Sequence, residues 1–205
     1  MRFLIISCFY FLLISCSLKT TKTLVEKEPD KKEVINEYFA NPDIDYVYKA
    51  KLQIYNNNYG GILIIKKIEP NHYRVVFTTE FGNKIFDLDL DADNLHVKYI
   101  VEQLNKKKLI KTLHSDFQLL VRQNNLIEKE FISKTDFIYK SKIINKDSYY
   151  FYLKSNNKLN KIISSSKTNE KLTIEFNDID DKIAKKISMV HHNFNMKIDL
   201  TFINN

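Results

Sequence analysis

The chain of 205 residues contains no tryptophan, two cysteines, three glycines and three prolines. Because glycine and proline are so scarce, collagen-like proteins and Gly/Pro-rich low-complexity proteins are excluded. Both cysteines, Cys8 and Cys16, lie within the first sixteen residues. The rest of the chain therefore has no disulfide and no thiol for metal binding or nucleophilic catalysis. Its stability must come from an apolar core.

The sequence also lacks the motifs that mark common enzymes and metal sites. It has no HExxH, no GxSxG, no glycine-rich phosphate loop and no paired Cys/His spacing. His191 and His192 are adjacent, and on a strand they would point to opposite faces, so they cannot share one metal ion. The four aspartates in the range 87–93 alternate at period two, which predicts a solvated strand face rather than converging ligands. We therefore expect no catalytic residues, no cofactor and no metal.

The formal net charge of +7 is spread along the chain rather than concentrated. Most lysines alternate with apolar residues, which is typical of solvated strand faces. We therefore expect no nucleic-acid partner. Attraction to the acidic head groups of a membrane stays open, because a basic surface is drawn to such lipids.

The first residues carry a membrane-targeting pattern. Arg2 is followed by an apolar run from Phe3 to Ile14, about 18 Å long as a helix and shorter than the ~30 Å core of a bilayer. This layout is typical of a secretory signal peptide. The run closes with Leu13-Ile14-Ser15-Cys16, which resembles the lipobox of bacterial lipoproteins. We expect residues 1–15 to be removed and Cys16 to carry acyl chains; an incidental cysteine or an uncleaved anchor are the alternatives.

The residues that follow divide into a tether and one domain. Residues 16–32 are rich in Lys, Thr and Glu, contain Pro29, and predict a flexible tether. Lys19 to Lys32 could reach about 45 Å if fully extended. Residues 33–205 are expected to form a single β-rich domain. At its start, the segment from Asp30 to Phe39 predicts a short N-terminal helix, because its apolar residues share one side.

From Tyr46 onward, apolar and polar residues alternate with period two. Five such segments up to about residue 100, separated by turn signals such as Asn57–Gly61 and Gly82-Asn83, predict an antiparallel meander with one buried face. We count about ten strands in the whole chain. The later ones include residues 149–153, 172–176 and 194–202.

A helical period interrupts the strands. Leu109, Leu113 and Phe117 follow helical spacing, which predicts a helix from Lys106 to about Arg122. The run Lys106-Lys107-Lys108 stands at its N-terminal end, where positive charge is unfavourable for the helix dipole. A lipid head group or a protein carboxylate nearby would offset this charge.

The order of lipobox, tether, meander, central helix and second run of strands resembles the LolA/LolB-like superfamily of periplasmic lipoprotein carriers and outer-membrane lipoprotein receptors. The resemblance implies a mostly β fold with helices (α+β). A strongly curved antiparallel sheet would form an incomplete barrel, capped by the central helix and the short N-terminal helix. The stretches that carry it are Gly61–Lys67, Tyr73–Phe77, Phe81–Asp87, the helix around Asp116–Leu120 and the closing strands.

The resemblance also implies a function. A protein anchored to the periplasmic face of the outer membrane through the acyl chains on Cys16 would bind lipid, or the acyl chains of lipoproteins, in an apolar cavity between sheet and helix. The same inward faces could instead form a solid core. The protein would then be a structural or assembly lipoprotein that docks another protein on its sheet. The residues expected at the cavity are Leu52, Ile54, Ile64, Val75, Phe77, Phe86, Leu88, Leu113 and Phe117.

Overall fold

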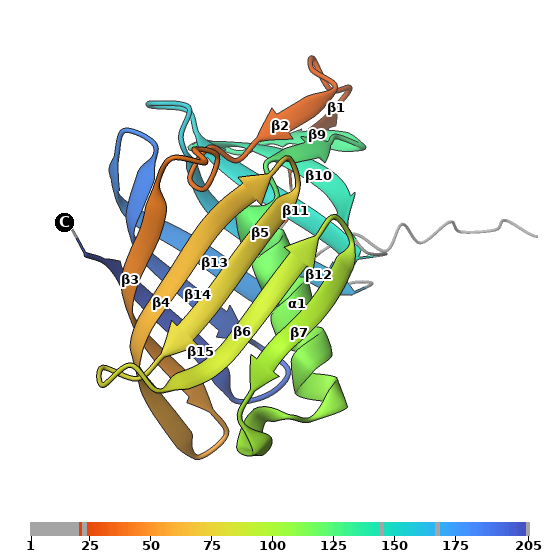
Figure 1. Ribbon diagram of the computed structural model, residues 1–205. Coiled ribbons are helices and arrows are strands. Elements are labelled where there is room, and N and C mark those ends of the chain that lie inside the picture. The colour runs from red at the N-terminus through yellow and green to blue at the C-terminus, as the bar shows by residue number, and fades with distance from the viewer. Residues whose placement is uncertain (1–20, 22–23, 144–145, 167–168, 204–205) are drawn as a thin grey trace, which may run out of the picture.

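The structure is a computed structural model that describes residues 21, 24–143, 146–166 and 169–203 (Figure 1). Within these residues the chain forms fifteen strands, one α-helix and one 3-10 turn. No helix in the described part is both long enough and apolar enough to span a bilayer. The elements are β1 (Val25–Lys27), β2 (Glu33–Ile35), β3 (Asp45–Ile54), β4 (Asn57–Glu69), β5 (His72–Thr78), β6 (Lys84–Asp91), β7 (Asn94–Ile100), η1 (Glu102–Leu104), α1 (Lys107–Val121), β8 (Asn124–Leu126), β9 (Lys129–Ile132), β10 (Asp136–Ile143), β11 (Lys146–Leu153), β12 (Leu159–Ser166), β13 (Asn169–Asp180), β14 (Ile183–His191) and β15 (Met196–Phe202).

Thirteen strands form one antiparallel sheet in the order β1-β9-β10-β11-β12-β13-β14-β15-β3-β4-β5-β6-β7, and β2 and β8 form a separate pair. The two halves of the large sheet meet where β15 pairs with β3, with Ile198 opposite Leu52 and Leu200 opposite Ala50. Register shifts interrupt five of the strand pairs, and such bulges bend a sheet. The sheet is not closed, because β1 and β7 remain as its edges.

The sheet curves around α1, with strands β4–β7 on one side of the helix and β11–β14 on the other (Figure 1). On β3, alternate residues such as Tyr48, Ala50 and Leu52 face the apolar core. Helix residues Leu113 and Phe117 are fully buried against them. The predicted meander and the predicted central helix are therefore confirmed, the helix to within about a residue at each end.

The predicted N-terminal helix over 30–39 is wrong. Glu33–Ile35 form strand β2 instead, which pairs with β8 just after α1. A ten-residue helix is marginal by itself, and here the backbone finds partners elsewhere. Val34 is buried between exposed Glu33 and Ile35, as strand alternation requires. The buried Asn36 side chain then donates to the Leu120 carbonyl oxygen at 2.8 Å, so this segment supports the end of α1.

Part of the predicted flexible tether is also a strand. Within 16–32, Val25–Lys27 form β1, which pairs with β9 because the edge of that strand offers free backbone groups. Leu24 packs against a second apolar cluster, which lies on the face of the sheet that points away from α1. Cys16 and the expected signal peptide, residues 1–15, lie outside the described residues. The members of this outer cluster are Phe131, Ile138, Tyr149, Phe151 and Ile163.

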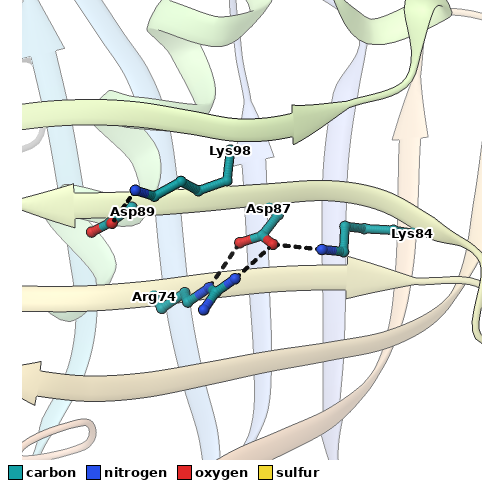
Figure 2. Close-up of polar contacts among 5 residues, drawn as sticks. All are labelled: Arg74, Lys84, Asp87, Asp89 and Lys98. Atoms are coloured by element: carbon teal, nitrogen blue, oxygen red, sulfur yellow. Dashed lines mark hydrogen bonds and ion pairs between the residues drawn. The ribbon is translucent and has the colours of Figure 1, made fainter.

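Asp87 and Asp89 of β6 lie on the same outward face, where they form ion pairs (Figure 2). Asp87 accepts two hydrogen bonds from the Arg74 guanidinium, both at 2.9 Å, and one from Lys84 Nζ at 2.7 Å. Asp89 lies 3.3 Å from Lys98 Nζ. Asp87 is only 1% exposed, so it is shielded by its cationic partners and not solvated as the sequence pattern predicts. Among the described residues, no group of three His, Cys, Asp or Glu side chains is arranged to hold a metal ion.

The Asp87 network makes a pH-dependent contribution to stability. Hydrogen bonds from Arg74, with help from Lys84, lower the pKa of Asp87 to about 2. Because the folded pKa lies below the unfolded value, this stability is present above pH ~4 and is lost as the pH falls towards 2. We expect Asp87→Asn to cost about 2 kcal/mol at pH 7. The difference from wild type should shrink near pH 2, as urea unfolding at several pH values would show.

Asp180→Asn is the matched control for this prediction. Asp180 pairs with Lys185 at 2.9 Å, but its side chain is 69% exposed. An exposed pair contributes little, so this variant should follow the wild-type unfolding curve across the pH range. If Asp87→Asn is as stable as wild type at pH 7, the network does not stabilise the fold.

Candidate functional site

Most of the residues expected to line a cavity belong to the buried interior. Eight of the nine belong to one buried cluster, the exception being Ile64. The Phe77 and Phe86 rings lie 5.4 Å apart, and the Phe86 and Phe117 rings 5.8 Å apart, between the sheet and the middle of α1. This part of the interior is packed with side chains. The other members of the set in the cluster are Leu52, Ile54, Val75, Leu88 and Leu113.

Ile64 lies on the opposite face of β4, so its assignment to the inward face is wrong. Its cross-strand partners are Val47 and Val76, which are only partly buried, whereas Leu63 and Ile65 enter the core. Residues 62–65 are all apolar. Period-two alternation therefore cannot show which of them face inward, and a shift of one residue moves every side chain to the other face.

A buried hydrogen bond ties α1 to the sheet. Asp116 Oδ2 lies 2.7 Å from His191 Nε2, and the two side chains are 4% and 6% exposed. Burial raises the pKa of Asp116, and the hydrogen bond with His191 opposes that rise. The His191 ring packs on Phe194 at 4.5 Å. His192, which follows the end of β14, shares a hydrogen bond with Thr173, so the two histidines have different partners.

Further polar contacts hold the C-terminal half of α1 and the loop that follows it. Lys67 Nζ donates to the Ala40 carbonyl at 3.0 Å and to Gln123 Oε1 at 2.9 Å. Gln118 donates to the Ala92 carbonyl, and Arg122 lies 3.0 Å from Asp93. Among the described residues, the polar side-chain contacts between α1 and the sheet lie in the segment from Ser115 to the C-terminal end of the helix. The N-terminal half rests on apolar packing.

An apolar pocket of about 300 Å³ lies at this N-terminal end. Its wall comes from the end of β3, η1, the first turns of α1 and the loop between β14 and β15. Lys106 and Lys108 also line the pocket, and Lys108 Nζ lies 6.0 Å from the centre of the Phe194 ring. The lining residues are Ile54, Tyr55, Asn57, Gln103, Leu104, Lys106, Lys108, Leu109, Thr112 and Phe194.

Exposed aromatic side chains lie at the same end of the molecule. Successive turns of an antiparallel meander alternate between its two ends, so the β3–β4 turn, the β5–β6 turn and the start of α1 share one end (Figure 1). Tyr55 is 49% exposed in the first of these turns, and Phe81 is 94% exposed in the second. Of the two, Tyr55 lines the pocket, and its ring lies 6.2 Å from the Phe194 ring.

A larger pocket, of about 420 Å³, lies near β2 and the turn between β13 and β14. Its lining includes the charged side chains Lys31, Glu33, Glu37, Asp181 and Lys182. Charged side chains therefore make up a larger share of its lining than of the lining of the pocket beside Phe194. The smaller pocket is the better candidate for an apolar ligand.

Apart from Ile54, none of the lining residues is expected at a site from its sequence pattern. Leu104 and Phe194 lie outside regular strands, and Leu109 had been assigned only to the apolar face of the helix. One signal was present: the lysine run at 106–108, which is unfavourable for the helix dipole, borders this pocket.

Comparison of the sequence with protein-family profiles and with curated proteins finds no match. Among solved structures, the chain is similar to a LolA superfamily protein from Nitrosomonas europaea, with a TM-score of 0.53 and 9% identity over 82% of this chain and 88% of that one. It is also similar to a domain from Vibrio parahaemolyticus named for outer membrane lipoprotein sorting, with a TM-score of 0.45 and 12% identity over 78% and 83% of the two chains. At identities this low, the similarity lies in the path of the backbone and does not extend to individual residues.

Proposed function

We propose that this chain, whose fold is LolA/LolB-like as the sequence resemblance predicted, is an envelope protein that binds a lipid or acyl chain without catalysing a reaction. The binding site is the apolar pocket at the N-terminal end of α1. Its apolar wall beside solvent is the observation that carries the proposal. The exposed rings of Tyr55 and Phe81 at the same end support contact with a membrane, because aromatic side chains favour the boundary between water and apolar surroundings.

The anchor of this protein is Cys16, on the periplasmic face of the outer membrane. Two or three acyl chains hold a protein at the membrane far more firmly than a single chain does. Tyr149 of the outer cluster is hydrogen-bonded to Thr21, and five residues of chain reach at most about 18 Å. The outward face of β9–β12 would therefore stay close to the bilayer, well within the 45 Å expected for a fully flexible tether.

Native mass spectrometry tests the anchor, and uptake of a fluorescent fatty acid tests the binding site. The full-length protein extracted from bacterial membranes should lack residues 1–15 and carry covalent acyl groups at Cys16. The mature chain with Cys16→Ser should take up a fluorescent fatty acid. Thr112→Trp should reduce this uptake about tenfold or more, because the indole would fill the pocket that Thr112 lines.

Lys111→Trp is the control for the blocking variant. Lys111 is exposed on the same helix and does not line the pocket, so uptake should stay at the wild-type level. Uptake that persists in Thr112→Trp would place the lipid elsewhere. An unmodified Cys16 would remove the anchor from the proposal and leave the pocket untouched.

The filled interior beneath the middle of α1 favours a second function, the docking of another envelope protein. Strand β7 is an edge of the sheet, and its Val97 and Tyr99 side chains are 38% and 45% exposed. A partner could add a strand to this edge. In the same mass spectra, one stoichiometric protein bound to a lipid-free chain would favour docking over lipid binding.

A further inference from the structure

The lysine run at the start of α1 is destabilising for the helix that carries it. Lys106 is the N-cap residue and makes no side-chain capping hydrogen bond, and the first turn contains no acidic residue. The first N–H groups of a helix carry partial positive charge, so Lys107 and Lys108 there add repulsion. All three lysines are exposed. The arrangement costs stability unless an anion offsets it.

Among the described residues, no protein carboxylate offsets this charge. None of the ion pairs involves Lys106, Lys107 or Lys108. Glu102, in the adjoining η1 turn, forms no ion pair in that set and does not line the pocket. Two kinds of anion could offset the charge of the lysines: a protein carboxylate or the head group of a lipid. The described part of the chain offers no such carboxylate, so an anionic head group is the remaining candidate.

The space available limits the apolar part of the ligand. A volume of about 300 Å³ is at the lower end of small-molecule sites, which span ~300–1,000 Å³. The interior beyond it is occupied by the packed rings of Phe77, Phe86 and Phe117. The pocket therefore suits one acyl chain and is too small for the two or three chains of a lipoprotein anchor.

From these two observations, we infer that the pocket selects a single-chain anionic amphiphile, with the chain against Ile54, Leu109 and Phe194 and the head group beside Lys106 and Lys108. This inference rests on the proposed lipid-binding function and narrows its ligand. A lysophospholipid with an anionic head group and a fatty acid share this chemistry, with a phosphate and a carboxylate respectively.

The test compares ligands of equal chain length on the mature chain with Cys16→Ser. Displacement of a fluorescent fatty acid would be measured with lysophosphatidylglycerol, lysophosphatidylcholine, oleate and a triacylated lipopeptide. We expect lysophosphatidylglycerol to displace the probe at least about tenfold better than lysophosphatidylcholine or the lipopeptide. Comparing lysophosphatidylglycerol with oleate shows whether the site prefers a phosphate or a carboxylate head group.

The double variant Lys106→Glu/Lys108→Glu should separate binding from folding. It should weaken binding of lysophosphatidylglycerol about tenfold, while raising the unfolding midpoint by about 2–4 °C, because acidic residues suit a helix N-terminus. Loss of binding together with a gain in stability cannot arise from misfolding. Lys134→Glu/Lys142→Glu, at two exposed lysines that do not line the pocket, makes the same change of charge and should leave binding unchanged.

The outcomes distinguish this inference from the function on which it rests. Equal binding of anionic and zwitterionic lysolipids, or equal loss in both double variants, would overturn the head-group assignment. If Thr112→Trp still blocked uptake, lipid binding would stand. Tight binding of the lipopeptide would overturn the single-chain limit. Failure of the wild-type chain to bind any of the four ligands would remove both proposals.

Discussion

Phe117→Ala is expected to destabilise the domain by about 3–5 kcal/mol, the largest effect predicted for this protein. Phe117 is fully buried on the face of α1 that meets the sheet, and its ring lies 5.8 Å from that of Phe86. Removing the ring leaves a void that the surrounding strands cannot easily close, because β5 and β6 are fixed by their hydrogen-bonded neighbours on both sides. The polar contacts from Asp116 and Gln118 would still hold the helix in place.

Urea unfolding, followed by circular dichroism, measures this loss. Phe81→Ala is the matched control, because it removes the same side chain from a position that is 94% exposed. It should change stability by less than about 0.5 kcal/mol. A Phe117→Ala protein as stable as wild type would mean that the space beneath α1 is loosely filled. The interior would then have room for the larger cavity that the sequence resemblance implies.

Gly61→Ala is expected to cost at least about 3 kcal/mol, although it adds a single methyl group. Gly61 lies in β4 opposite Ala50, and a Cβ atom at this position would stand 1.8 Å from the Thr78 carbonyl oxygen and 2.8 Å from its carbon. These are backbone atoms of the neighbouring strand, so no rotamer change can relieve the overlap. Strands β4 and β5 would have to separate at the point where their pairing begins.

The neighbouring glycine is a control within the same strand. A Cβ on Gly60 would have nothing within 4 Å, so Gly60→Ala should be close to neutral or slightly stabilising, because alanine loses less backbone entropy on folding. Thermal unfolding of the two variants would show the contrast. Equal stability of Gly61→Ala and Gly60→Ala would mean that β5 moves away at little cost.

The strands of the first meander and the helix could be predicted because their burial patterns are regular. On β3, every second residue from Tyr46 to Ile54 is buried, and local alternation reports this directly. The phase of β4 could not be read, since residues 62–65 are apolar on both faces. The N-terminal helix failed for another reason: the pairing partner of β2 is β8, about ninety residues later in the chain. No local pattern reveals such a partner.

The candidate pocket was beyond prediction because its wall is assembled from distant segments. Ile54, Leu104 and Phe194 come from a strand end, a 3-10 turn and a loop. In each case, the sequence indicates only an apolar residue near a break in the pattern. Periodicity predicted an apolar inward face but left open whether that face forms a solid core or lines a cavity, and eight of the nine residues expected at a cavity belong to the buried cluster. The lysine run at 106–108 gave a local sign of a site, because its positive charge is unfavourable at the N-terminal end of a helix.

The pairing of β15 with β3 has a consequence for the order of folding. These strands are about 150 residues apart in the chain, yet they join the two halves of the sheet. Until the last strand is in place, both halves keep an unsatisfied edge that could pair with another chain. Contacts so distant in sequence form slowly. We therefore expect the newly made protein to pass through a long-lived, aggregation-prone intermediate, which holding chaperones would have to protect until Met196–Phe202 completes the sheet.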